Sequence, residues 1–160
     1  MTTIRVQVPA TSANCGPGFD CLGLALNLYN IFEFTPDANA TSFSYTFHGY
    51  GADLLEKEDP KKNLIGIAIE QVFAKAQEPI QYGHITSETL IPPSRGLGSS
   101  STAIVGGLLL ANNLVNKPLS KEELLVIANR MEGHPDNVAP AIYGNLCCAT
   151  GLKTKVLNTV

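Results

Sequence analysis

The segment from Pro92 to Thr102, PPSRGLGSSST, is the feature that most restricts how this chain can fold. Gly96 and Gly98 let the backbone adopt positive φ angles and approach a ligand closely, and successive N–H groups in such a turn can hold an anion. The serines lead into a mostly apolar stretch from Ala103 to Leu110, so we expect the hydroxyls at a helix N-terminus, where free amides and the helix dipole favour negative charge. The segment therefore predicts a phosphate-binding loop.

The same loop has two alternative interpretations. It contains no lysine and does not match G-x-x-x-x-G-K-[ST], so it is not a Walker-type P-loop. For a bare G-x-G-x-x-S pattern, a turn that only caps a buried helix is the alternative. Three consecutive serines exceed what one N-cap requires, and two prolines restrict the entry, which favours the phosphate site.

Length and charge limit the classes of partner. The chain has 160 residues, enough for one domain with a good core, or one domain plus a fragment. Its formal charge of −3 is spread out without a basic block, so we expect a small-molecule partner and neither nucleic acid nor a membrane. The start lacks the apolar core of a signal peptide, which predicts a cytoplasmic location. The four cysteines lack metal-ligand spacing and are expected to be free thiols.

Alternation of apolar and polar residues predicts three strands near the N-terminus. The first runs from Ile4 to Val8 and ends at Pro9, and a loop from Ala10 to Gly23 follows it. The third covers Phe43 to Phe47. Together they predict an antiparallel sheet with one face on a core. The second strand is expected to place four apolar residues on one face: Leu26, Leu28, Phe32 and Phe34.

Two helices have recognisable N-terminal signals. Asn63 is a typical N-cap before the stretch from Leu64 to Phe73, whose apolar residues, Leu64 included, form an inward stripe. Ser120 and Glu123 fit a capping box for a helix that runs through Met131.

The remaining segments complete an α+β order without internal repeats. Ile85 to Ile91 is expected to be a strand that leads into the glycine loop, and Asp53 to Lys62 a charged, solvated loop. Gly144 to Thr150 is typical of a strand that begins near the end of the chain, so the sequence is interpreted as the N-terminal part of a longer protein.

The segment from Val8 to Gly23 is a second candidate for ligand binding. The two glycines around Pro17 predict a sharp turn that presents Asn14 and Asp20 from nearby positions. Asp20 can pair with an ammonium group, and Asn14 can both donate and accept hydrogen bonds. The alternative is a tight turn in which both side chains bond their own backbone.

A third cluster lies at the end of the capped helix, where four ionisable or amide side chains occur within six positions: Glu132, His134, Asp136 and Asn137. A single histidine at a helix end is more often structural than catalytic. The whole cluster fits a kinase, which needs a carboxylate for Mg²⁺ and groups that hold the acceptor hydroxyl in line with the γ-phosphate.

The three blocks together resemble a known family. The loop from Pro92 to Thr102 is similar to the ATP-binding motif of the GHMP small-molecule kinases, and Val8 to Gly23 and Glu132 to Gly144 are similar to two further motifs of homoserine kinases. The resemblance implies that residues 1–160 are an α+β GHMP kinase N-terminal, ATP-binding domain with the ribosomal protein S5 domain 2-like, two-layer α/β sandwich. It also implies that the C-terminal domain of the family is absent from this chain.

The resemblance also implies an enzymatic activity. Homoserine kinases phosphorylate the side-chain hydroxyl of L-homoserine with ATP and Mg²⁺, which yields O-phosphohomoserine in threonine biosynthesis. Because the C-terminal domain helps to complete the acceptor site in this family, the chain alone is expected to be inactive. The alternatives are another GHMP kinase with a different small alcohol and a nucleotide-binding fragment without turnover, and the sequence leaves a homodimer open.

The resemblance also assigns roles to residues. Ser100 and Glu132 would share Mg²⁺, and Asp136 is the candidate base, although homoserine kinases are thought to work without one. Thr102 stands where many relatives have alanine. The residues implied in catalysis are Glu132, His134 and Asp136. Those implied in acceptor binding are Asn14, Asp20, His134 and Asn137. Those implied in ATP binding are Asn63, Pro92, Pro93, Ser94, Arg95, Gly96, Leu97, Gly98, Ser99, Ser100, Ser101 and Thr102.

Overall fold

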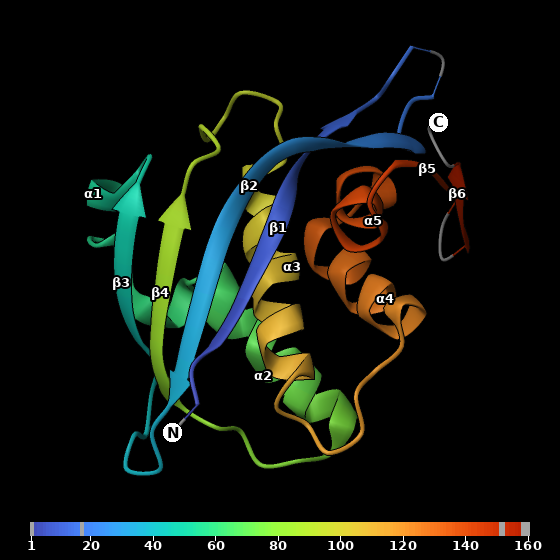
Figure 1. The fold of residues 1–160 in the computed structure, drawn as a ribbon. Coiled ribbons are helices and arrows are strands. Elements are labelled where there is room, and N and C mark those ends of the chain that lie inside the picture. The colour runs from blue at the N-terminus through green and yellow to red at the C-terminus, as the bar shows by residue number, and fades with distance from the viewer. Residues whose placement is uncertain (1, 17, 151–152, 158–160) are drawn as a thin grey trace.

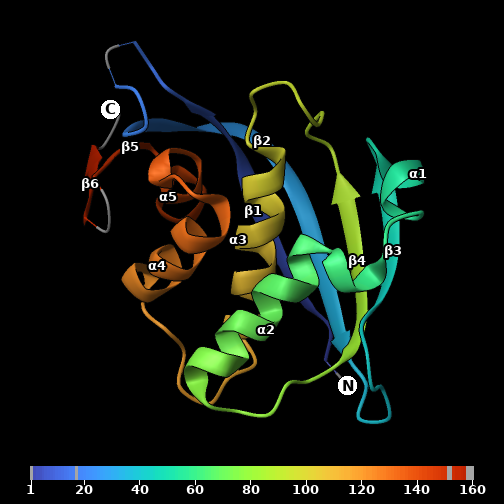
Figure 2. The ribbon, with the colours of Figure 1, turned by 180° about the vertical axis from the view of Figure 1, so that it is seen from behind.

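A mixed six-stranded sheet with its longer helices packed along one side makes up the computed structural model, which describes residues 2–16, 18–150 and 153–157 (Figure 1). Seen from behind, the helices lie in front of the sheet (Figure 2). This confirms the expected two-layer α+β architecture. The elements in chain order are β1 Ile4–Ala13, β2 Leu22–Pro36, β3 Ser44–Gly49, α1 Ala52–Leu55, η1 Pro60–Lys62, α2 Leu64–Ala76, β4 Gly83–Thr89, α3 Ser99–Asn112, α4 Lys121–Glu132, α5 Pro135–Tyr143, β5 Leu146–Thr150 and β6 Lys153–Leu157.

The sheet is not wholly antiparallel, so that expectation was wrong at one edge. β2 pairs antiparallel with β1, β4 and β5, whereas β3 pairs parallel with β4. The chain passes from β3 to β4 through α1, η1 and α2, and such a helical crossover returns the chain in the same direction. The charged segment expected to be a solvated loop contains α1 and η1, and Asp59 caps η1 by accepting from Lys61 N at 3.0 Å.

β1 does not end at Pro9 as predicted but continues to Ala13. The register shifts between Pro9 and Thr11, where β2 carries extra residues opposite Ala10. A bulge of this kind lets a strand continue past a proline, which cannot donate to the ladder. The same irregularity leaves Leu28 36% exposed, so it does not join the inward face that Phe32 and Phe34 form.

The core lies between the sheet and the helices. Phe32 and Phe34 of β2 pack there with Ile69 and Phe73 of α2 and with Leu108 of α3, all nearly inaccessible to solvent. α2 and α3 approach closely because Gly107 has no side chain, and a Cβ there would overlap the carbonyl of Ile65. This packing holds the N-terminus of α3 in place.

The two predicted helix caps are confirmed. Asn63 Oδ1 accepts from Ile65 N at 3.0 Å, and Ser120 and Glu123 form the reciprocal capping box. Leu64, expected to face inward, is 38% exposed, because it faces an open pocket and not the core. Met131 is partly buried against the core.

α5 is a helix that the sequence analysis did not identify. Gly133 ends α4 in the left-handed conformation (φ 97°), and Pro135 starts α5 at once. Pro140 within α5 has no N–H for the carbonyl of Asp136, and that carbonyl lies against Gly23 of β2, where a Cβ would overlap it. The short helix thus docks on the sheet through a glycine.

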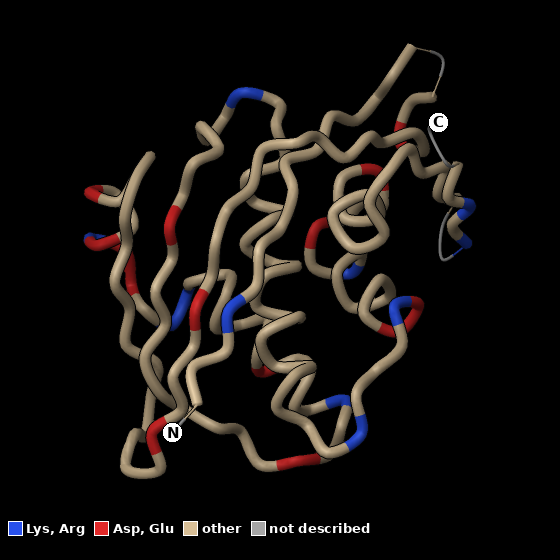
Figure 3. Tube along the Cα trace, viewed as in Figure 1, with Lys and Arg blue, Asp and Glu red and all other residues tan. Residues whose placement is uncertain are grey.

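Charged residues are scattered along the described trace without a basic cluster (Figure 3). Across the described ranges, the helices are too short or too polar to span a membrane. The four cysteines are free thiols, as predicted. Pro17, in the turn predicted to present Asn14 and Asp20, lies outside the described residues.

Candidate functional site

The glycine loop connects the end of β4 to the first residue of α3 and arches over the top of the sheet (Figure 1). Ser94, Gly96 and Gly98 have left-handed φ angles of 57°, 69° and 66°. Gly98 is the N-cap of α3 and supplies no side-chain acceptor, so the first amides of the helix stay available to a ligand. Ser99 to Ser101 form the first turn, as expected. The loop is therefore built as an anion site at a helix N-terminus.

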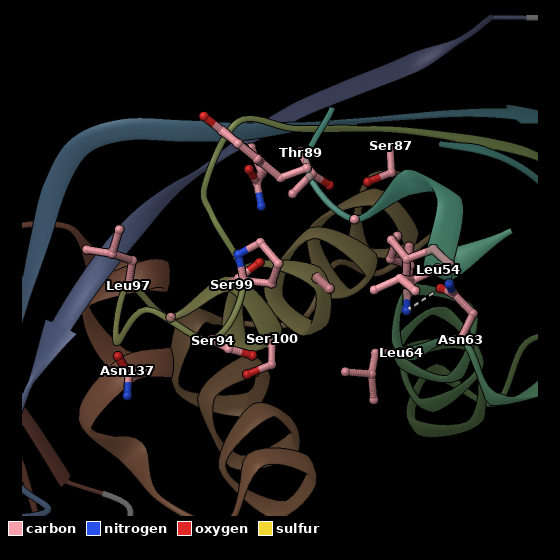
Figure 4. A pocket seen from close by; sticks show the side chains of 18 of the residues that line it. Leu54, Asn63, Leu64, Ser87, Thr89, Ser94, Leu97, Ser99, Ser100 and Asn137 are labelled. Carbon is pink, nitrogen blue, oxygen red and sulfur yellow. Dashed lines mark hydrogen bonds between the residues drawn. The ribbon is translucent and has the colours of Figure 1, made fainter. Parts of the chain in front are cut away.

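A pocket of about 660 Å³ lies beside this loop. At its centre Ser94, Ser99 and Ser100 lie close together at the start of α3, with Asn137 on one side and Asn63 on the other (Figure 4). Its far end, between α1 and the start of α2, is lined by Leu54, Leu55, Lys62 and Leu64. A polar centre with an apolar end suits a ligand that has both a charged and a flat apolar part.

Glu132 is held directly against the loop. The hydroxyls of Ser100 and Ser101 both donate to Glu132 Oε1, at 3.0 and 2.8 Å. Hydroxyl and carboxylate oxygens are ligands that Mg²⁺ accepts, and the predicted pair of Ser100 and Glu132 is thus brought together. In the described ranges no group of three or more His, Cys, Asp or Glu side chains could hold a metal ion.

The fold places only one of the three candidate residues at the start of α5 in the pocket. Asn137 lines the pocket, and its Oδ1 accepts from Thr11 Oγ1 at 2.8 Å. Asp136 is only 3% exposed, accepts from Asn137 N at 2.9 Å and is not among the described residues that line the pocket. His134 is exposed at the N-cap position of α5 and also lies outside the lining. The structure therefore brings Asn137 to the pocket, but not Asp136 or His134.

The loop between β1 and β2 presents its two candidates differently. Asn14 lines the pocket, whereas Asp20 is exposed outside it. Both have left-handed φ angles, of 57° and 54°, and Asn14 Oδ1 accepts from Asp20 N at 2.9 Å. This is the backbone bond that the tight-turn alternative describes for Asn14. Among the described residues, none accepts a hydrogen bond from the amide nitrogen of that side chain.

The remaining loop residues also fall into two groups. Pro93, Ser94 and Gly96 to Ser100 line the pocket, whereas Pro92, Ser101 and Thr102 do not. Ser101 is buried against Glu132. Arg95 is exposed outside the lining and bonds the carbonyl of Ser94 at 3.5 Å.

Three residues at the site were not singled out from the sequence. Asn30 and Thr11 are buried polar side chains that fasten the loop, and Lys62 is a cation in the pocket wall. An asparagine at an inward position of an alternating strand, in phase with Phe32 and Phe34, is the signal that could have identified Asn30. Thr11 and Lys62 carry no comparable signal, because threonine and lysine are common in loops.

Comparison with known proteins identifies the family of the chain. The model of the GHMP kinases N terminal domain matches residues 63–145, and the chain therefore belongs to the GHMP kinase family. Among its relatives are homoserine kinases, of which that from Picosynechococcus sp. is 49% identical over 146 residues, 90% of this chain and 48% of the relative. That from Desulfitobacterium hafniense is 45% identical over 155 residues, 96% of this chain and 50% of the relative.

Solved structures agree with the fold. The crystal structure of homoserine kinase from Cytophaga hutchinsonii matches with a TM-score of 0.84 at 28% identity, over 97% of this chain and 51% of the other. Mevalonate kinase from Methanococcus jannaschii shares the fold at 16% identity, with a TM-score of 0.77 over 99% of this chain and 56% of the other. The chain thus spans about half the length of these proteins, and the expected GHMP kinase fold is confirmed.

Proposed function

We propose that this chain is the nucleotide-binding part of a homoserine kinase, which transfers the γ-phosphoryl group of ATP to the side-chain hydroxyl of L-homoserine. The observation that carries the proposal is the contact of Ser100 and Ser101 with Glu132 at the N-terminus of α3, where Ser100 and Glu132 line a pocket of ligand size. Relatives named homoserine kinase at 45–49% identity support the choice of acceptor. The product would be O-phosphohomoserine, made in the cytoplasm for threonine biosynthesis.

The donor would lie along the long axis of the pocket. The free amides of the loop from Gly96 to Ser100 suit the phosphates, because the helix dipole adds to their attraction for negative charge. The apolar end beside Leu54 and Leu64 suits the adenine ring, and Asn63 lies there with its Oδ1 already bonded to the backbone of α2. Lys62 in the same wall would add positive charge.

Mg²⁺ would be held by Ser100 and Glu132, where it would neutralise charge on the transferred phosphoryl group. Ser101 donates to the same carboxylate oxygen as Ser100 and is fully buried, so it would fix the orientation of Glu132. The ion and the loop amides would stabilise the negative charge of the transferred phosphoryl group. The side chains would hold both substrates in line.

The acceptor would lie on the side of the pocket that Asn14 and Asn137 line. Asp20, exposed on the adjoining loop, would meet the ammonium group, and His134 would approach from the start of α5. The part of the relatives that this chain does not span would complete the site. No dedicated base is proposed, because the carboxylate of Asp136 is buried and bonded to its own helix.

Calorimetry with Mg·ATP tests the donor site in the chain as it stands. We expect binding by the wild type and a loss of at least roughly tenfold in Glu132→Gln, because a charge-assisted contact is removed. Glu122→Gln, on the same helix but outside the pocket lining, is the matched control and should bind as the wild type does. A folded wild-type chain that does not bind Mg·ATP would refute the proposal.

The acceptor is tested by turnover in a polypeptide of the same length as the relatives. Homoserine, mevalonate and shikimate are compared side by side as phosphoryl acceptors. We expect a preference for homoserine, and a preference for either of the other alcohols would assign the chain to another GHMP kinase.

A further inference from the structure

Thr11 connects two parts of the site that are far apart in the sequence. It lies in β1 and is fully buried. Its backbone N–H donates to Leu97 O at 3.1 Å, and its hydroxyl donates to Asn137 Oδ1 at 2.8 Å. One residue of the sheet thus contacts both the end of the glycine loop and the first turn of α5.

Gly98 packs against the hydrogen bond between Thr11 and Asn137. A Cβ at this position would overlap Thr11 Oγ1 and would come within 3.2 Å of Asn137 Oδ1. The N-cap of α3 therefore sits directly on the hydrogen bond between Thr11 and Asn137. A shift of either partner would displace the loop, because packed side chains leave no space to absorb the movement.

The hydrogen bond also decides which way the amide of Asn137 faces. Because Thr11 donates to Oδ1, the nitrogen occupies the other end of the planar amide. In Figure 4 the oxygen of Asn137 is the end nearer to Leu97. Asn137 lines the pocket, and among the described residues none accepts a hydrogen bond from its Nδ2, so we infer that these N–H groups can donate to a ligand there.

We propose that Thr11 is a positioning residue: its hydroxyl holds the Asn137 amide beside the glycine loop with the nitrogen toward the pocket, so that the nitrogen donates to an oxygen of the bound substrates. That oxygen belongs to a phosphate of ATP or to the acceptor hydroxyl. Its identity rests on the proposed function, whereas the orientation of the amide does not.

Nuclear magnetic resonance of the ligand-free, ¹⁵N-labelled chain tests the orientation. The side-chain amide signals of Asn137 are assigned by their loss in Asn137→Ala. We expect Thr11→Val to shift or broaden them and Thr11→Ser, which keeps the hydroxyl, to leave them unchanged. Thr154→Val is the matched control, because in the described part of the chain the buried Thr154 hydroxyl has no hydrogen-bond partner. Unchanged Asn137 signals in Thr11→Val would overturn the proposal.

Three ligand additions then identify the oxygen: the non-hydrolysable analogue Mg·AMP-PNP, homoserine, and both together. A shift of the Asn137 amide with the analogue alone identifies a phosphate oxygen, and a shift only when homoserine is present identifies the hydroxyl. Affinity for that ligand should be roughly three- to tenfold weaker in Thr11→Val and restored in Thr11→Ser. Equal losses in both variants would reduce Thr11 to a packing role and overturn the proposal. A wild-type chain that binds neither ligand refutes the proposed function, while the ligand-free signals still decide the role of Thr11.

Discussion

Asn30 donates a 2.8 Å hydrogen bond from Nδ2 to Thr102 Oγ1, which joins the middle of β2 to the first turn of α3. The other end of the same amide accepts from the N–H groups of Leu90 and Ile91, at 2.8 and 3.0 Å. Asn30 is 2% exposed, so these bonds form away from water. One side chain therefore contacts both ends of the glycine loop.

Thr102→Val should destabilise the fold by about 1–3 kcal/mol, because it leaves the buried Asn30 Nδ2 without its partner. It also removes the bond from Thr102 Oγ1 to Ser99 O. Thr102→Ser keeps the hydroxyl and should cost only about 1 kcal/mol for the lost methyl group. Urea unfolding measures both variants, and equal losses would show that the hydrogen bonds do not matter.

Gly98→Ala should be more damaging than Gly96→Ala, although both glycines have a left-handed φ. The alanine at 96 meets no atom within 4 Å and carries only the backbone cost, about 1–2 kcal/mol. The alanine at 98 would in addition overlap Thr11 Oγ1. Unfolding free energies and Mg·ATP affinities of the two variants are compared, and a smaller effect at 98 would contradict the observed contact.

Asp136→Asn should fold and keep partial phosphotransfer activity. Asparagine retains the oxygen that accepts from Asn137 N, so the first turn of α5 is preserved. Circular dichroism checks the fold, and turnover is measured in a polypeptide as long as the relatives. A loss as large as that of Glu132→Gln, or one within the roughly 100- to 10,000-fold range typical of a missing general base, would identify Asp136 as the base.

Cys147 should resist alkylation at mildly alkaline pH. It is fully buried, and burial raises the pKa of its thiol to about 11, so little of the reactive thiolate forms. The neighbouring Cys148 is partly exposed and serves as the internal control. Mass spectrometry after timed iodoacetamide treatment at pH 8 measures both rates, and equal labelling in the folded protein would disprove the expectation.

The capping box of α4 should weaken in acid. The bond from Ser120 N to Glu123 Oε2, 2.9 Å, lowers the pKa of Glu123. The ionised carboxylate therefore stabilises the folded state at neutral pH, and this contribution is lost as the pH falls through the lowered pKa. The difference in melting temperature between the wild type and Glu123→Gln should be largest near pH 7 and should shrink toward pH 3; a constant difference would contradict it.

Local signals in the sequence were enough for several elements. The caps at Asn63 and Ser120 were predicted because an N-cap bond joins residues two or three positions apart. The glycine and serine loop was predicted for the same reason, since its φ angles and the start of α3 depend on neighbouring residues.

Other features could not be predicted from local signals. α5 was missed because Pro140 within it argues against a helix, although Pro135 at its first position is compatible with one. The docking of α5 against Gly23 compensates for Pro140. The parallel pairing of β3 with β4 depends on where α2 packs, and the continuation of β1 past Pro9 depends on the extra residues of β2. Each of these features depends on a contact with a segment that is distant in the sequence.

The sequence by itself determined the α+β class, the family motifs and the glycine and serine loop, because these depend on residue types at fixed short spacings. Only the tertiary structure decided which residues of those motifs share a pocket: Asn137 with Ser100 and Glu132, but not Asp136 or Asp20. It also revealed Thr11 and Asn30 as the residues that fasten the loop. Their hydrogen bonds join segments that only the packing of helices on the sheet brings within bonding distance.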